Sequence, residues 1–427
     1  MAIGFGLDFG TTNSSLALAG PNGVEVAVFP CATGVTESFR SLLYLHRIRE
    51  NGRNTIKSWS GPAGIDQYLA SDDKGRLIQS LKSFLTSRSL RSTEVFGRQF
   101  RLEELIARIL ADIRIAAEKQ FGSVATRIVV GRPVRFVGAE SSADDEYALA
   151  RLKEALLLGG FKEVSFEYEP VGAAFHYEST LNHDELVLIG DFGGGTSDFS
   201  LLRVGPSFRK AAAGSRVIGN EGVAVAGDSF DGRIIRHLVS PALGAGSELE
   251  SDGKRLPAPN WVYFKLERWH HLSFLKSAET LNMLKGVAAR SLEPKKIRAL
   301  LYLIQHDLGY QLHQAVQRAK VAISQEDRTR LQFCDGDTEV DRELSRGDFE
   351  SWITEELQAI EDRVDALLSK TGTLPAEIDA VFLTGGSSFV PAVRGTFASR
   401  FGQDKIRTGG EFTSVARGLA LRAAQMD

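Results

Sequence analysis

Two segments of the chain are closely related to each other, and each predicts the same local structure. The first is G-L-D-F-G-T-T-N-S-S-L-A-L from Gly6 to Leu18, and the second is G-D-F-G-G-G-T-S-D-F-S-L-L from Gly190 to Leu202. Each contains a strand that ends in Asp-Phe-Gly, a short Gly/Thr turn and a second strand, which predicts a β-hairpin. Glycine adopts the backbone conformations that tight hairpin turns need. The repeat therefore predicts two equivalent hairpins in two related halves of the chain.

The chemistry of the two turns is suited to binding an anion. A bare glycine backbone lets N–H groups approach an anion closely, and the threonines add hydroxyl donors. Asp8 and Asp191 stand beside the turns. Hydrated Mg²⁺ is commonly held by one or two carboxylates while it keeps several of its waters. If the hairpins face each other, they form a clamp for the phosphates of a nucleotide.

Three other interpretations of the glycine-rich turns do not fit the neighbouring residues. A P-loop requires G-x-x-x-x-G-K-[ST], which the sequence lacks. Protein kinases also contain Asp-Phe-Gly, but the chain has neither an H-R-D catalytic loop nor a V-A-I-K strand. A Rossmann fingerprint opens a helix, whereas Ser15–Leu18 and Phe199–Leu202 are typical of strands.

Composition sets limits on the partners and the compartment of the chain. Its 427 residues have a net charge of −3 and 43% hydrophobic residues, which does not favour nucleic-acid or membrane-surface binding. No apolar run approaches the roughly 18 residues that span a bilayer, and the N-terminus lacks the pattern of a signal peptide. We therefore expect a cytoplasmic protein that binds neither nucleic acid nor membrane.

Strand and helix patterns alternate in both halves, which predicts an α/β fold. Helices are predicted at 103–121, 147–158, 170–180 and 414–424, and strands at 127–132, 164–168 and 381–384. Apolar residues from Ile297 to Ile323 predict one long amphipathic helix. Segments 139–146 and 244–253 are predicted loops. The second hairpin restarts the pattern at Glu185, so lobes are expected at 1–184 and 185–427.

Several motifs together resemble the actin-like ATPase fold, most closely the nucleotide-binding domain of DnaK-type seventy-kilodalton heat-shock proteins. The two hairpins are similar to the first and second phosphate motifs of that family. E-P-V-G-A-A-F from Glu169 resembles its connecting helix, and A-G-D-S-F-D from Ala226 the segment after the second hairpin. F-L-T-G-G-S-S-F-V-P from Phe382 resembles its adenosine motif, and V-Q-R-A-K-V-A-I-S from Val316 its adenine-pocket helix. The resemblance is weak over 232–313.

The resemblance implies a fold of two lobes, each built on a ribonuclease-H-like mixed sheet with flanking helices, and a nucleotide cleft between them. It also implies inserted subdomains at about 47–100 and 232–313. The length resembles that of the YegD-like group, which consists of the nucleotide-binding domain alone, so no peptide-binding domain is expected.

By the same resemblance, individual residues acquire expected roles toward ATP or ADP and Mg²⁺. The expected catalytic residues are Asp8, Lys82, Glu169, Asp191 and Thr196, with Asp8 and Asp191 also holding Mg²⁺ through water. Lys82 would contact the γ-phosphate and orient the attacking water, and Glu169 would couple the site to lobe movement. The expected nucleotide-binding residues are Gly10, Thr11, Thr12, Asn13, Gly193, Gly194, Gly195, Thr196, Gln317, Lys320, Ser324, Gly385, Gly386, Ser387 and Ser388. Gln317 stands where the family usually has glutamate.

The leading functional hypothesis is a chaperone-like ATPase with slow turnover. It would be monomeric and would act as a nucleotide-dependent switch on a protein partner. Three alternatives remain open at this point. One is a small-molecule kinase of the same superfold, another is a filament-forming actin-like protein, and the third is a domain that binds nucleotide without turnover.

Overall fold

A computed structural model describes most of the chain, which divides into two compact units. The described residues are 3–32, 34–50, 52–71, 75–122, 127–209, 216–251, 253–268, 275–409 and 412–426. Unit 1 comprises residues 1–226, 359–389 and 393–427, and unit 2 comprises residues 227–358 and 390–392.

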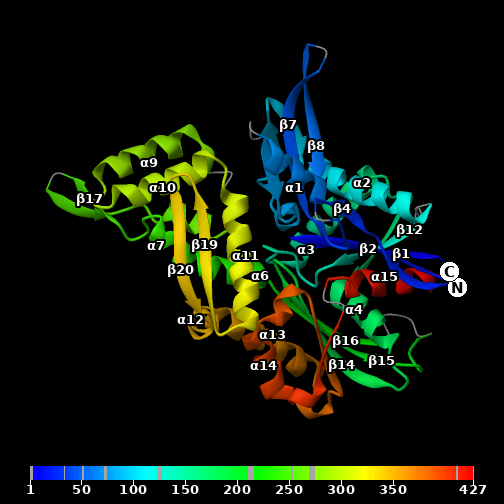
Figure 1. Cartoon of the computed structure of the whole chain (residues 1–427). Helices are drawn as coiled ribbons and strands as arrows, with labels where there is room; N and C mark the ends of the chain where they lie inside the picture. Colours follow the sequence, from blue (N-terminus) through cyan, green and yellow to red (C-terminus); the bar gives the residue numbers. More distant parts are fainter. Residues whose placement is uncertain are drawn as a thin grey trace. The chain divides into compact units, whose positions relative to one another are not determined.

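The first hairpin lies at the centre of a mixed sheet in unit 1 (Figure 1). It consists of β1 (Gly4–Phe9) and β2 (Asn13–Gly20), and β3 (Gly23–Val26) continues the antiparallel side. On the other side of β1, β12 (Arg127–Arg132) and β13 (Glu163–Tyr168) are parallel to it. The strand order is therefore β13-β12-β1-β2-β3, and the short β6 (Phe39–Arg40) also pairs with β2.

The second hairpin lies in a sheet with the same connectivity. It consists of β14 (Glu185–Phe192) and β15 (Ser197–Val204), followed by the antiparallel β16 (Val217–Val223). On the other side of β14, β21 (Ala380–Thr384) and β22 (Ile406–Thr408) are parallel to it. The order β16-β15-β14-β21-β22 repeats the first sheet strand for strand, which confirms the two related hairpins predicted from the sequence.

Two helices each follow a strand of one sheet but pack on the other sheet. Helix α4 (Glu169–Glu178) directly follows β13 of the first sheet, yet it packs on β14 and β15 of the second. Helix α15 (Ser414–Ala424) comes after β22 of the second sheet, yet it packs on β1 and β2 of the first. The two helices also pack on each other, where a Cβ on Gly418 would lie 1.7 Å from the carbonyl oxygen of Gly172. The halves therefore hold each other through a backbone-to-backbone helix crossing.

An inserted region and two long helices share one hydrophobic core with the first sheet. The insertion has a three-stranded sheet, a hairpin, a helix and a 3₁₀ turn: β8 (Arg53–Ser60), β7 (Leu42–Glu50), β9 (Arg76–Gln79), β10 (Ser92–Val95), β11 (Arg98–Arg101), α1 (Gly61–Ala70) and η1 (Leu81–Phe84). Helix α2 (Leu102–Phe121) confirms the helix predicted at 103–121. Helix α3 (Ser142–Leu158) begins inside the predicted 139–146 loop, so that prediction was partly wrong. The cause is a capping box, in which Ser141 and Asp144 bond to each other's backbone N–H.

The remaining elements of unit 1 are short, apart from two helices near its C-terminal part. They are β4 (Phe29–Cys31), β5 (Gly34–Thr36), η4 (Pro375–Glu377), η5 (Gly386–Phe389), α14 (Pro391–Phe401), η6 (Gln403–Lys405) and most of α13 (Thr354–Thr371). Helix α15 confirms the last helix predicted from the sequence. No helix among the described residues is long and apolar enough to cross a membrane.

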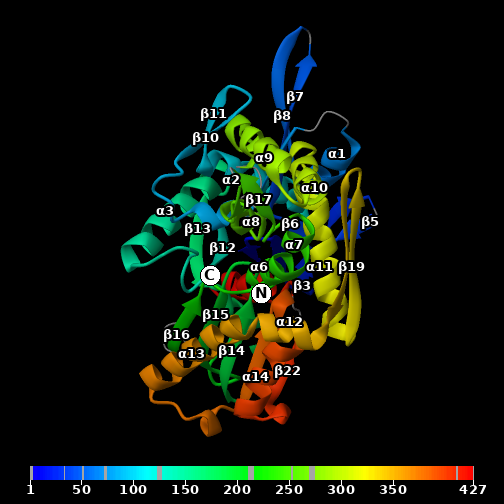
Figure 2. The ribbon, with the colours of Figure 1, turned by 90° about the vertical axis from the view of Figure 1, so that its left-hand side faces the viewer.

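Unit 2 is mainly helical, with two hairpins. Its elements are α6 (Gly227–Ile234), the π-helical turn η2 (Ile235–Val239), α7 (Ser240–Ala242), β17 (Glu248–Ser251), β18 (Lys254–Pro257), α8 (Trp261–Leu266), α9 (Ala278–Arg290), α10 (Pro294–Gln305), α11 (Gly309–Gln325), β19 (Arg328–Asp335), β20 (Thr338–Ser345) and α12 (Arg346–Trp352). Figure 2 shows the β19–β20 hairpin beside α11, which packs on β19.

Two predictions for this region were wrong. The single long helix from 297 to 323 is two helices, because Asp307 adopts a left-handed conformation (φ 56°) between α10 and α11. The apolar face nevertheless continues, since both helices bury their apolar stripes. Strand β17 lies inside the predicted 244–253 loop. Unit 2 also extends beyond the expected 232–313 insertion, while the division into lobes at residue 185 stays a prediction.

The crossing of α4 and α15 leads to a stability prediction. We expect Gly418→Ala to lower the free energy of unfolding by about 3 kcal/mol, because the new methyl group overlaps the Gly172 carbonyl in a packed core. The matched control is Gly395→Ala in α14, where a Cβ meets open space. That variant should be neutral or stabilised by about 0.5–1 kcal/mol through helix propensity. Urea denaturation measures both, and equal stabilities would contradict the crossing.

Candidate functional site

The tip of the first hairpin carries the residues expected to bind phosphate. β1 ends at Phe9 and β2 begins at Asn13, so Gly10–Thr12 form the turn. A Cβ on Gly10 would lie 2.2 Å from the carbonyl oxygen of Asn13, so a larger residue does not fit here. The N–H of Ser41 donates to the carbonyl oxygen of Thr12 at 2.9 Å. The turn is therefore constrained by the close approach of Gly10 to Asn13 within it and by the hydrogen bond from Ser41.

The second tip is supported by the strand expected to carry the adenosine motif. The N–H of Gly193 donates to the carbonyl oxygen of Thr196 at 3.0 Å, which closes the tip. Gly385 follows β21 with a φ of +82°, and a Cβ there would lie 2.2 Å from the carbonyl oxygen of Phe192. The hydroxyl of Ser387 donates to the carbonyl oxygen of Gly193 at 3.4 Å. The structure thus brings residues 385–388 against the second tip.

The two tips approach each other within unit 1. A Cβ built on Gly195 would lie 3.3 Å from Oγ1 of Thr11 and 3.2 Å from Cγ2 of Val137. Asp8 and Asp191 occupy equivalent places, each next to the last residue of its strand. Each carboxylate therefore belongs to a residue two positions before the glycine that begins its tip.

A buried ion pair lies among the expected catalytic residues. Nζ of Lys82 is 2.6 Å from Oε1 of Glu169, and both side chains are buried, with 7% and 6% of each residue exposed. Lys82 belongs to η1, and Glu169 is the first residue of α4, where a carboxylate interacts favourably with the helix dipole. The negative charge of Glu169 acts on Asp8 and Asp191, so the structure brings these four expected catalytic residues together.

The carboxylates of this cluster have raised pKa values. Burial, followed by the charge of Glu169, raises the pKa of Asp8 to about 7, while Lys82 opposes the shift. Burial and the charges of Glu169, Asp8 and Asp198 raise the pKa of Asp191 well above its usual range. Several acids around one ammonium leave excess negative charge, which favours binding of protons or of a cation.

One member of the cluster was missed in the sequence analysis. Asp198 on β15 lies directly opposite Asp191 in the hairpin, where the first hairpin has Ser15 opposite Asp8. It is fully buried, accepts a hydrogen bond from the N–H of Val134 at 2.8 Å, and burial followed by the charge of Glu169 raises its pKa to about 7. The acid at Asp198, where the related first motif has Ser15, was a signal for this residue.

The donor set fits a hydrated Mg²⁺. The cluster offers carboxylate oxygens, which are the ligands that Mg²⁺ prefers. Over the parts of the chain that the structure describes, no three His, Cys, Asp or Glu side chains are arranged to hold a metal ion directly. The carboxylates of Asp8 and Asp191 are thus suitable donors for such an ion or for its waters.

The expected nucleoside-binding residues Gln317, Lys320 and Ser324 lie on α11 of unit 2. They follow the helix spacing and form one face. Nζ of Lys320 is 2.7 Å from Oδ1 of Asp231 on α6 and donates to the carbonyl oxygen of Gly227 at 3.1 Å. The hydroxyl of Ser324 donates to the carbonyl oxygen of Lys320 at 2.8 Å. Their roles toward a nucleotide stay predictions.

Comparison with known proteins shows the family. The family described as "Hsp70 protein" matches residues 48–254 and 305–426 of this chain. The chain is 25% identical to the chaperone protein DnaK of Thermosipho africanus over 98% of its own length and 58% of the relative's. It is 24% identical to the chaperone protein DnaK of Thermotoga petrophila, over 98% of this chain and 59% of that relative. The chain thus spans less than two thirds of the length of these relatives.

The chain belongs to the Hsp70 family. This confirms the resemblance inferred from the motifs, and the two repeated sheets agree with the actin-like ATPase fold of that family. The family match omits residues 255–304, and these lie within the region 232–313 where only a weak resemblance was expected.

The raised pKa values lead to a prediction about stability and pH. In the unfolded chain Asp8 ionises near pH 4, but in the folded protein it ionises near pH 7. The folded state therefore binds the extra proton between these values, and stability due to this group is lost as the pH rises through 7. We expect Asp8→Asn to unfold with about 1–3 kcal/mol more free energy than the wild type at pH 8.

At pH 5 the difference between Asp8→Asn and the wild type should be clearly smaller than at pH 8, because the carboxyl of Asp8 is then protonated in the folded protein and loses its proton only in the unfolded chain. Urea unfolding of the nucleotide-free protein at pH 5 and pH 8 measures this. The matched control is Asp66→Asn at a half-buried position of α1, which should change stability little at either pH. A variant at Asp8 that is less stable than wild type at pH 8 would contradict the cluster.

Proposed function

We propose that this chain binds ATP or ADP together with Mg²⁺ and hydrolyses ATP slowly. The single observation that carries the proposal is the approach of the two hairpin tips beside the cluster of Asp8, Lys82, Glu169 and Asp191. Membership of the Hsp70 family supports the same activity.

The phosphates would be bound from two sides. In this proposal Thr11, Thr12 and Asn13 donate N–H and hydroxyl groups from the first tip, and Gly193 to Thr196 donate from the second. Asp8 and Asp191 would hold Mg²⁺ through its waters, and the ion would supply positive charge that neutralises the phosphates. The glycine backbone at Gly385 and Gly386, with Ser387 and Ser388, would contact the nucleotide beside the second tip.

Hydrolysis would depend on positioning and charge, which dominate phosphoryl transfer. Lys82 would contact the γ-phosphate and orient the attacking water, and Glu169 would hold the ammonium group in place through their 2.6 Å ion pair. Asp191 is suited to accept a hydrogen bond from that water, because burial keeps its carboxyl basic. Preorganised groups in a buried site stabilise developing charge more strongly than groups in water.

The nucleotide state would act on a protein partner. A ligand that favours one arrangement of a protein shifts the population of arrangements, and a partner that prefers one of them then binds more or less tightly. The relatives are named as chaperones, which supports a protein partner, and the net charge of −3 favours neither nucleic acid nor membrane.

Single-turnover hydrolysis of Mg·ATP without an acceptor tests this proposal. We expect the wild type to release phosphate and Asp191→Asn to do so at least about 100-fold more slowly, because one positioned polar group contributes about that factor. Both proteins should show a rise in thermal unfolding temperature that grows with nucleotide concentration. Phosphate transfer that requires an added small-molecule acceptor would instead support a kinase, and no nucleotide-dependent stabilisation would refute the clamp.

A further inference from the structure

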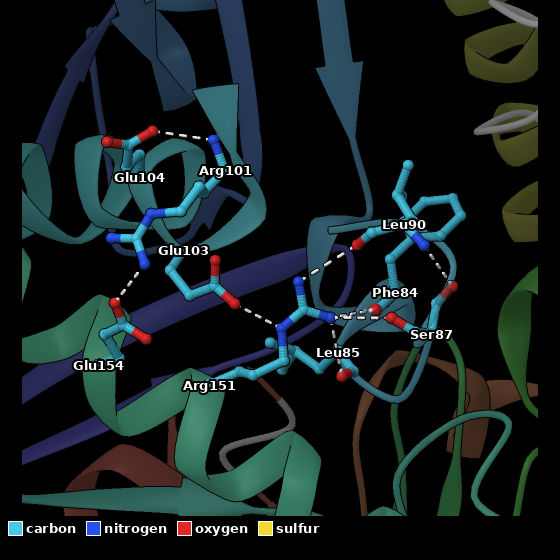
Figure 3. A network of polar contacts seen from close by, with 9 residues as sticks. All are labelled: Phe84, Leu85, Ser87, Leu90, Arg101, Glu103, Glu104, Arg151 and Glu154. Atoms are coloured by element: carbon cyan, nitrogen blue, oxygen red, sulfur yellow. Dashed lines mark hydrogen bonds and ion pairs between the residues drawn. The ribbon is translucent and has the colours of Figure 1, made fainter. Parts of the chain in front are cut away.

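The segment that follows Lys82 is held by one side chain from a distant part of the chain. Arg151 on α3 donates from Nη1 to the carbonyl oxygens of Phe84, Leu85 and Ser87 at 3.3, 3.1 and 3.1 Å. From Nη2 it donates to the carbonyl oxygen of Leu90 at 3.2 Å. Figure 3 shows these carbonyl groups turned toward the guanidinium group. The segment 84–90 is therefore wrapped around Arg151.

Glu103 completes this arrangement from the first turn of α2. Its carboxylate accepts a hydrogen bond from Nε of Arg151, and the two side chains are only 8% and 6% exposed. A buried guanidinium group without partners would be costly, but here each of its three nitrogens donates to an oxygen. Arg151 thus donates hydrogen bonds to one carboxylate and to four backbone carbonyls at and after the end of η1.

Segment 84–90, which Arg151 binds, is directly connected to Lys82 in the chain. Phe84 is the last residue of η1, the turn that carries Lys82, and the N–H of Leu85 donates to the carbonyl oxygen of Lys82 at 3.2 Å. Two of the carbonyls bound by Arg151 therefore lie two and three residues beyond Lys82. A displacement of this segment would move the lysine relative to Glu169 and the other acids.

We propose that Arg151, held by Glu103, is a positioning residue for phosphoryl transfer, fixing segment 84–90 so that Nζ of Lys82 stays in place against Glu169. This inference rests on the proposed function of Lys82. The planar guanidinium fork is essential to it, because five donors in a fixed geometry reach several acceptors at once. A lysine would keep the charge beside Glu103 but could not bridge the carbonyls on both sides of the fork.

The variant Arg151→Lys tests the inference. Single-turnover hydrolysis at saturating Mg·ATP measures its rate, and equilibrium titration measures its affinity for nucleotide. We expect the rate to fall about 10- to 100-fold, as a misplacement near 1 Å can cause. The dissociation constant for ADP should change less than about 3-fold, since the described hydrogen bonds of Arg151 go to Glu103 and segment 84–90 and not to the hairpin tips. A role limited to stability would not produce this separation of rate from affinity.

Arg101 provides the matched control. Arg101 forms an ion pair with Glu154 of α3 at 2.6 Å, but both side chains are about half exposed, and Figure 3 shows this pair away from segment 84–90. Arg101→Lys should leave both the rate and the affinity unchanged. Equal losses in the Arg101 and Arg151 variants would overturn the inference.

A double-mutant cycle with Lys82→Met shows whether Arg151 acts through the lysine. We expect Lys82→Met to lower the rate, and Arg151→Lys to add no further loss in that background, because the two changes remove the same interaction. Multiplicative losses would overturn the inference and leave the proposed function intact. If Lys82→Met hydrolyses ATP at the wild-type rate, the role of Lys82 is wrong and the inference fails with it.

If Arg151→Lys does not fold, Arg151→Met combined with Glu103→Met replaces it, because an apolar pair of similar volume leaves no buried charge unpaired. The same separation of rate from affinity is expected, since the carbonyls of segment 84–90 again lose their common donor. A wild-type rate in that folded double variant would overturn the inference.

Discussion

The ion pair between Lys82 and Glu169 is the interaction on which the site depends. Without the ammonium group, the charges of Glu169, Asp8, Asp191 and Asp198 would repel one another in a buried environment, and burial already raises the pKa of the three aspartates. Lys82 lowers each of these pKa values, but one positive charge cannot balance four acids. In the proposed function, a hydrated divalent cation bound with the phosphates of the nucleotide would balance the remaining negative charge.

This cluster can exist only because two halves of the chain hold each other in register. Asp8 comes from the first sheet, Asp191 and Asp198 from the second, and Glu169 begins the helix that leaves the first sheet to pack on the second. The crossing of α4 and α15 at Gly172 and Gly418 brings the backbones into direct contact. Destabilising the core there should therefore affect the site as well as the fold.

Local patterns in the sequence predicted much of this arrangement. The two D-F-G hairpins, the helix at 103–121 and the last helix follow from turn residues and apolar spacing, which are local properties. The helix break at Asp307 was not predicted, because the apolar periodicity continues across it and the sequence gives no strong signal for an aspartate in the left-handed conformation. The packing of α4 and α15 on the opposite sheets joins residues far apart in the chain, and so do the hydrogen bonds of Arg151 to segment 84–90. No local sequence pattern predicts such long-range contacts.

The central claim is that buried acids at two facing tips bind a nucleotide through a divalent cation. Calorimetric titration of ADP into the protein, with Mg²⁺ present and with Mg²⁺ removed by a chelator, tests it most directly. The account predicts tight binding with Mg²⁺ and a loss of at least about 10-fold in affinity without it, because phosphates would then face uncompensated carboxylates. The same affinity with and without Mg²⁺ would contradict the account.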